Sequence, residues 1–113
     1  MQDYELDAYL GDVDATAEQR AALHAAADAV AARWPDPDLA DTREQALSAA
    51  AQVILGDDTL ETIAEQWQAA RRLERERHAA LTGALIATPG PEVTLADRAG
   101  VTRMTVRKAL GKG

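Results

Sequence analysis

Alanine supplies much of the apolar content of this chain, and this feature restricts its possible folds more than any other. The 113 residues are 47% hydrophobic, yet they include no phenylalanine, two tryptophans and two tyrosines. Alanine is the best intrinsic helix former, and no segment shows the sustained alternation of β-branched residues that is typical of strands. The sequence therefore predicts an all-α protein, a small helical bundle of about one ordinary domain.

The first helix with clear start and stop signals is expected between Thr16 and Trp34. Thr16 can cap its first turn, and Pro35 and Pro37 end it. Residues 1–14 are open to two interpretations. They form either a frayed arm or a short docking helix, since four apolar residues keep helical spacing: Leu6, Tyr9, Leu10 and Val13.

Two further helical segments follow before an unambiguous break. The first is expected to begin at Asp38 or Asp41 and to end near Gly56, which is a C-terminal signal. The second, residues 59–87, is either one long helix or two helices with a bend near the charged segment Arg71–His78. Gly83 is its one candidate breaker, and a glycine weakens a helix by only ~1 kcal/mol. The segment Thr88-Pro89-Gly90-Pro91 then stops it.

The charge of the chain is unevenly distributed. Residues 1–65 carry 15 acidic and 3 basic side chains, whereas residues 66–113 carry 4 acidic and 9 basic ones. The overall charge of −7 therefore hides a basic C-terminal half. We expect an acidic helical bundle over residues 1–70 and a region of different purpose over residues 71–113.

Residues 94–110 have the pattern of a helix-turn-helix, so the C-terminal region is expected to be a three-helix unit. Thr94 is expected to cap its short middle helix, Gly100 to make the turn with positive φ, and Thr102 to cap the last helix. Val106 and Leu110 would form the buried face of that last helix. Basic and hydroxyl side chains would then project outward, as in a helix that enters the DNA major groove.

The segment Gly-Val-Thr-Arg-Met-Thr-Val-Arg-Lys-Ala-Leu resembles the recognition helix of GntR-type regulators, especially their HutC-like branch. This resemblance implies that Arg103 and Arg107 reach base edges, that Thr105 contacts base or backbone, and that Thr102 contacts phosphate. Those regulators continue into a two-stranded wing and an effector domain, whereas only Gly111-Lys112-Gly113 follow here, so we expect a different architecture. The full set of expected DNA-binding residues is Thr94, Thr102, Arg103, Met104, Thr105, Arg107, Lys108 and Lys112.

The first helix of this unit should be the stretch that ends at Ala87. Leu81, Leu85 and Ile86 would cover the apolar residues of the two following helices. The arginines between Arg71 and Arg77 either touch flanking phosphates or pair with Glu74 and Glu76 at helical spacing.

One helix-turn-helix spans only a few base pairs, so useful affinity normally needs two copies. We therefore expect the acidic bundle to form a homodimer through close packing of six apolar residues: Val30, Trp34, Leu47, Ile54, Ile63 and Trp67. The favoured function is a sequence-specific transcriptional regulator of double-stranded DNA, a repressor or a plasmid- or phage-type accessory regulator that occupies its operator. The alternative is a protein-interaction adaptor.

Several other kinds of site and function lack support in the sequence. With no cysteine, disulfides and thiolate metal sites are excluded, and His24 and His78 do not form a metal-binding motif. No catalytic constellation is present, so we expect neither an enzyme nor a cofactor, and no small-molecule effector is evident. The acidic N-terminus is unlike a signal peptide and no long apolar run occurs, so a cytoplasmic protein without membrane contact is expected.

Overall fold

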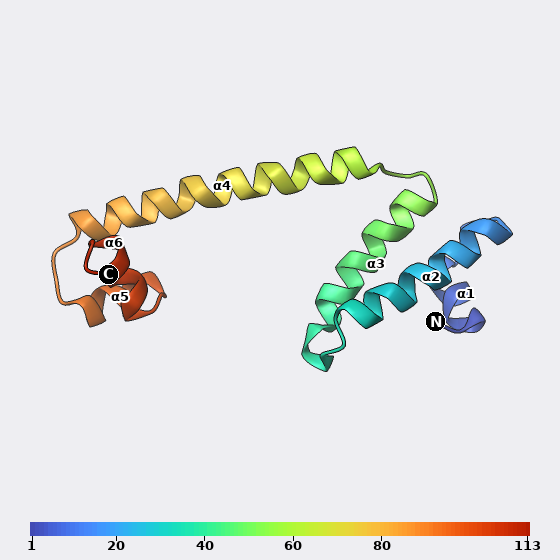
Figure 1. The fold of residues 1–113 in the computed structure, drawn as a ribbon, viewed down its shortest axis with the longest axis horizontal. Coiled ribbons are helices and arrows are strands. Elements are labelled where there is room, and N and C mark those ends of the chain that lie inside the picture. Colours follow the sequence, from blue (N-terminus) through green and yellow to red (C-terminus); the bar gives the residue numbers. More distant parts are fainter. The chain divides into compact units, whose positions relative to one another are not determined.

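The computed structural model describes all 113 residues and contains helices but no strands, which confirms the all-α class (Figure 1). The six α-helices are α1 (Asp3–Leu10), α2 (Ala17–Arg33), α3 (Ala40–Ile54), α4 (Leu60–Ala87), α5 (Glu92–Ala99) and α6 (Arg103–Ala109), and a 3-10 helix, η1 (Pro37–Leu39), precedes α3. The chain divides into an N-terminal unit, Met1–Glu65, and a C-terminal unit, Gln66–Gly113. No helix combines the length and the apolar character needed to cross a membrane.

The first residues form a docked helix, which decides between the two interpretations of residues 1–14. Leu6 and Leu10 of α1 are buried, whereas Tyr9 and Val13 are exposed and lie outside the core. Two polar contacts join α1 to α2: Arg20 donates to Asp7 at 2.6 Å, and His24 lies 2.9 Å from Asp3.

Helix α2 begins and ends where the sequence predicts. Thr16 and Gln19 form a reciprocal capping box, in which each side chain accepts a hydrogen bond from the other residue's backbone N–H. The helix ends at Arg33, just before Pro35. The Gln19 side chain also donates to the Ile54 carbonyl at 3.4 Å, so the same residue links α2 to the end of α3.

The start of the next helix differs from the prediction. Neither Asp38 nor Asp41 caps α3, because Asp36 instead accepts a hydrogen bond from the Asp38 N–H and starts η1. Pro37, at the first position of η1, has a fixed φ suited to a helical turn. Arg43 holds this corner by donating to the carbonyls of Trp34 and Asp36. The core of the N-terminal unit is small and consists of four buried residues: Leu6, Leu10, Leu23 and Ala51.

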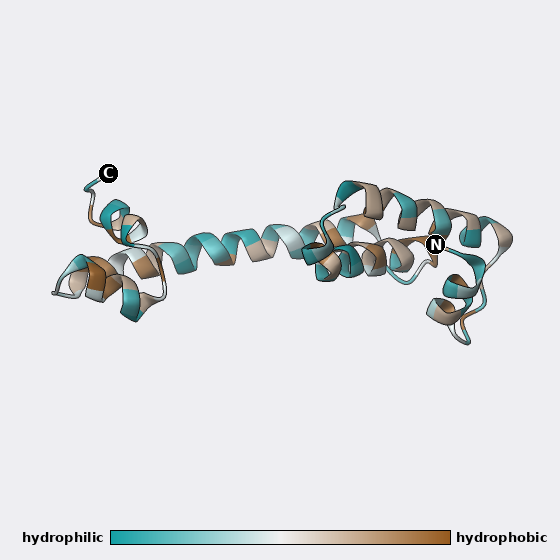
Figure 2. Cartoon of the chain, turned by 90° about the horizontal axis from the view of Figure 1, so that it is seen from below, coloured by the Kyte–Doolittle hydropathy of each residue, from teal (hydrophilic) through white to brown (hydrophobic).

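Helix α4 is continuous from Leu60 to Ala87, which decides between one helix and two. Its central turns are hydrophilic (Figure 2), and Gly83 lies inside the helix without a break. Near its end, Leu85 joins Leu95, Ala96 and Val106 in the core of the C-terminal unit. The expectation that Ile86 also covers this core is wrong, because Ile86 is 63% exposed. Consecutive helical residues point about 100° apart, so Ile86 turns away when Leu85 faces the core.

Candidate nucleic-acid interface

The segment from Pro91 to Leu110 forms two short helices joined by a tight connection. Helix α5 starts at Glu92, and its N-cap is Pro91, so the prediction that Thr94 caps this helix is wrong. Thr94 is an exposed residue within the first turns of α5. Since Pro91 is already extended, with φ −64° and ψ 146°, the helix begins directly after the proline without a side-chain cap.

The connection between α5 and α6 has the geometry that the sequence predicts. Gly100 is left-handed, with φ 69° and ψ 31°, a conformation that favours glycine. The N–H of the following residue, Val101, donates to the Ala96 carbonyl at 3.0 Å and closes the end of α5. Thr102 caps α6, because its hydroxyl oxygen accepts a hydrogen bond from the Thr105 N–H at 3.2 Å. The orientation of α6 is therefore fixed at its beginning.

Helix α6 is buried along one side only. Val106 is fully buried, and Ala109 and Leu110 pack partly against the same core. Arg103, Met104 and Lys108 are exposed, and Thr105 and Arg107 are half-buried. The C-terminal unit as a whole carries 9 basic and 4 acidic side chains, so α6 presents cations from a unit of positive charge.

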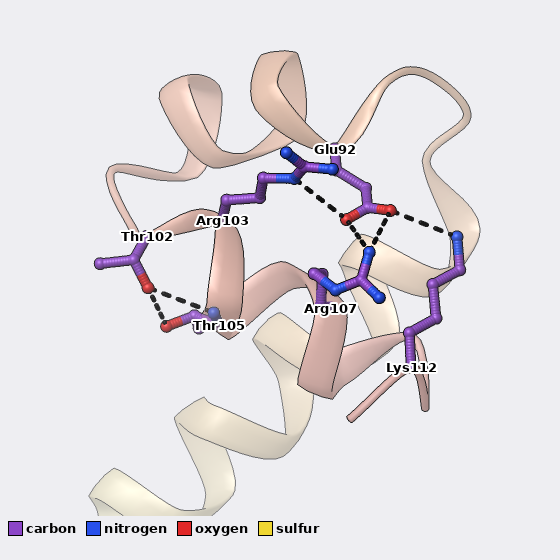
Figure 3. A network of polar contacts seen from close by, with 6 residues as sticks. All are labelled: Glu92, Thr102, Arg103, Thr105, Arg107 and Lys112. Carbon is purple, nitrogen blue, oxygen red and sulfur yellow. Dashed lines mark hydrogen bonds and ion pairs between the residues drawn. The ribbon is translucent and has the colours of Figure 1, made fainter.

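Glu92 brings three of these cations together (Figure 3). Its carboxylate lies 3.5 Å from Arg103 Nε and 3.4 Å from Lys112 Nζ, and Arg107 Nη1 donates to both carboxylate oxygens at 3.3 Å. We call these four residues the Glu92 network. Because the carboxylate comes from the first turn of α5 and two of the cations from α6, the network joins the two helices.

The Glu92 carboxylate is ionised under ordinary conditions. Its side chain is only 18% exposed, and this partial burial raises the pKa, but the attraction and hydrogen bonds of Arg107 and Lys112 outweigh it. The pKa of Glu92 therefore lies below the ordinary value of 4.5. One negative charge faces three positive ones, so the network keeps a positive excess.

Sequence reasoning missed Glu92. A glutamate in the first turn of a helix is explained by the helix dipole alone, and nothing near it in the sequence indicates another role. Its partners Arg107 and Lys112 are 15 and 20 residues away, so only the packing of α5 against α6 brings the charges together. The network also corrects the expectation that Arg107 projects freely outward: its side chain is 35% exposed and paired, whereas that of Arg103 is 62% exposed.

The remaining expected DNA-binding residues lie on or beside α6. The hydroxyls of Thr102 and Thr105 are 3.0 Å apart and contact each other. Met104 and Lys108 are exposed on α6, and neither makes an ion pair or side-chain hydrogen bond. The structure thus brings Arg103, Arg107 and Lys112 together through Glu92, whereas Thr94, an exposed residue of α5, is not part of this network.

The arginines in the middle of α4 do not pair with Glu74 or Glu76. All residues from Arg71 to His78 are exposed, and no ion pair within 4.0 Å forms among them. The Arg71 guanidinium instead lies over the Trp67 ring, 4.7 Å from its centroid. Apart from this contact, the segment is a solvated helix surface.

Of the six residues expected at a dimer interface, two line a common surface hollow. Ile54 and Ile63 line one apolar hollow of the N-terminal unit, together with Ala49, Ala50, Val53 and Leu60. Val30, Trp34 and Leu47 are half-buried on α2 and α3 but do not line this hollow. Trp67 belongs to the C-terminal unit, where its side chain is 55% exposed.

Comparison with models of known families, with curated proteins and with solved structures finds no match to this chain.

Proposed function

We propose that this chain is a sequence-specific regulator that binds double-stranded DNA, with α6 as the recognition helix in the major groove. One observation carries the proposal: α6 buries Val106 against the core of its unit and keeps Arg103, Arg107 and Lys108 on its accessible sides. The left-handed Gly100 and the Thr102 cap fix the helix in this orientation. A helix of this kind, buried on one side and basic on the other, suits the major groove.

The chemistry of these side chains assigns each a role in the proposed complex. Arg103 and Arg107 read guanine, since a guanidinium can donate two parallel hydrogen bonds to its O6 and N7 atoms. Thr102, Lys108 and Lys112 hold phosphates, which fix the register of the protein on the duplex. The exposed Met104 offers an apolar contact to a thymine methyl group. The resemblance of residues 94–110 to GntR-type recognition segments supports the same assignment.

The acidic N-terminal unit is compatible with DNA binding when it does not face the duplex. Its repulsion of phosphate is screened over a distance of ~8 Å at physiological salt. In the proposed mechanism, the protein represses or modulates a gene by occupying its operator. The N-terminal unit contributes dimerisation rather than DNA contact.

We infer that two copies associate through the apolar hollow of the N-terminal unit. Leu60 and Val53 line this hollow and are 70% and 43% exposed, so a partner helix would remove apolar surface from water. Alanines at 49 and 50 permit a close approach of helices. Sedimentation equilibrium at micromolar concentration should give the mass of two chains, and Leu60→Glu should reduce it to one. A wild-type mass of one chain would contradict the dimer.

The DNA-binding proposal is tested by fluorescence anisotropy with a labelled pool of random-sequence duplexes. Wild-type affinity should fall steeply as salt rises, because phosphate contacts release counterions. An Arg103→Ala/Arg107→Ala variant removes two cations of α6 and should bind the pool more weakly than the wild type. The matched control, Arg71→Ala/Arg75→Ala, removes the same charge from exposed positions of the same unit and should lose less. Absence of salt-dependent binding in the wild type would favour the adaptor function instead.

A further inference from the structure

The Glu92 network occupies only one edge of each arginine. Arg103 faces the carboxylate with Nε, and Arg107 faces it with Nη1. No other side-chain hydrogen bond or ion pair involves these two guanidinium groups in the structure. Because a guanidinium carries its five N–H donors on three nitrogens in a plane, two adjacent nitrogens of each arginine remain free. Two adjacent donors are what a bidentate contact to guanine requires.

The contacts of Glu92 are also loose enough to guide the arginines without removing them from the surface. The separations of 3.3 to 3.5 Å exceed the ~2.7–2.9 Å of a strong charge-assisted hydrogen bond. Arg103 in particular remains 62% exposed. The carboxylate itself is held at the start of α5, a helix whose Leu95 and Ala96 are buried against α6 and α4. A fixed anion therefore restricts two long, flexible cations.

The same carboxylate limits unspecific attraction to DNA. Arg103, Arg107 and Lys112 without Glu92 would form a group of three unopposed positive charges, which any phosphate attracts regardless of sequence. Glu92 cancels one of them and repels phosphate from the place where they meet. Its low exposure means that bulk solvent screens this effect less than it would at an open surface.

We infer that Glu92 is the positioning residue that sets the sequence specificity of the proposed DNA contact. It holds Arg103 and Arg107 by one edge each, directs their free donor pairs toward guanine, and lowers the affinity for phosphate as such. This inference rests on the proposed function, since it assigns to Glu92 a role within that same interface.

Three variants separate the positioning role from a simple effect of charge. Glu92→Gln removes the charge and keeps the shape of the side chain. Glu92→Asp keeps the charge but is one methylene shorter, so it cannot reach all three cations. Asp97→Asn is the matched control, because Asp97 is an exposed acid on the same helix with no ion pair.

The experiment begins with selection of a binding sequence from randomised duplex DNA by the wild-type protein. Affinities of all four proteins are then measured for the enriched duplex and for a shuffled duplex of the same composition. We expect Glu92→Gln to bind the shuffled duplex more tightly and to lower the specific-to-shuffled affinity ratio about tenfold, within the range that one bidentate arginine contact supplies. Glu92→Asp should lower the ratio with little change on the shuffled duplex, and Asp97→Asn should leave the ratio within about twofold.

The outcomes distinguish this inference from the proposed function. If the wild type enriches a sequence but Glu92→Gln and Glu92→Asp keep the full ratio, Glu92 has no positioning role and only the inference fails. An equal fall of the ratio in Asp97→Asn would assign the effect to net charge and overturn the inference as well. If the wild type enriches no sequence, the proposed function fails and the inference fails with it. Circular dichroism of each variant shows whether its helices are retained. If Glu92→Gln does not fold, the specific-to-shuffled affinity ratio of Glu92→Asp tests the positioning role of Glu92.

Discussion

The same substitution, glycine to alanine, should change the stability of the C-terminal unit in opposite directions at two positions. At Gly100 the backbone is left-handed, with φ 69°, and a Cβ placed there has no heavy atom within 4 Å. The cost of Gly100→Ala is therefore that of the backbone conformation alone, about 1–2 kcal/mol. Gly83 lies inside α4 with a helical backbone, and its Cβ would also meet open space. Gly83→Ala should therefore stabilise the unit by about 0.5–1 kcal/mol.

The two variants should thus differ by about 2 kcal/mol, which corresponds to about 30-fold in the ratio of folded to unfolded molecules. Hydrogen exchange of the amides in α5 and α6 measures the opening of this unit separately from that of α2 and α3. Wild-type protection in Gly100→Ala would refute the argument that the α5–α6 connection requires a left-handed residue. A clear loss of protection in Gly83→Ala would refute the argument that α4 is an ordinary, uncrowded helix at that position.

Three further predictions address the cores, a cap and the Glu92 network. Leu95→Ala removes a buried side chain from a core of four buried residues, so it should lower the free energy of unfolding of the C-terminal unit by about 2–5 kcal/mol. We expect this unit to unfold while the amides of α2 and α3 keep their protection from hydrogen exchange; native-like amide protection in α5 and α6 would contradict this. Thr16→Ala removes the capping box and should destabilise the N-terminal unit by about 1 kcal/mol in urea unfolding, whereas Thr94→Ala, at an exposed position that caps no helix, should change stability by less than about 0.5 kcal/mol. Because the pKa of Glu92 is lowered in the folded state, its ionisation stabilises the fold at neutral pH, and this contribution is lost as the pH falls below about 4.5 and through the lower native pKa. The difference in melting temperature between wild type and Glu92→Gln should therefore shrink on acidification, and a difference that stays constant would contradict the network.

Local signals in the sequence are sufficient to predict helix caps and turns where neighbouring residues decide the structure. The cap at Thr16, the cap at Thr102 and the left-handed turn at Gly100 depend on contacts within a few residues, and each forms as predicted. The all-α class follows from the same local preferences of an alanine-rich chain.

Sequence reasoning is insufficient to place the start of a helix where several local signals compete. Asp36, Asp38 and Asp41 are all suitable caps, and the structure uses Asp36 for η1 because Pro37 follows it directly. At the start of α5, Pro91 precedes Thr94 and begins the helix first. Helix continuity over residues 59–87 is likewise not decided by the sequence, because the charged segment Arg71–His78 interrupts the apolar pattern, although Gly83 costs only ~1 kcal/mol.

The least predictable feature was the arrangement of charges around α6. The basic residues of the candidate site could be identified from helical spacing, but Glu92 could not, because its partners lie on another helix. The exposed side chain of Trp67 shows a related limit. Its position on an apolar stripe indicated a core or interface, whereas within this chain it contacts the Arg71 guanidinium in the open middle of α4.

Selection from randomised duplex DNA at physiological salt, with the full chain, tests the proposed function most directly. The proposal predicts enrichment of one motif with two-fold symmetry, whose half-sites are separated by about one helical turn of DNA or a multiple of it. The Arg103→Ala/Arg107→Ala variant should enrich nothing under the same conditions. Equal recovery of sequences by the wild type and this variant would contradict the assignment of α6 as a recognition helix.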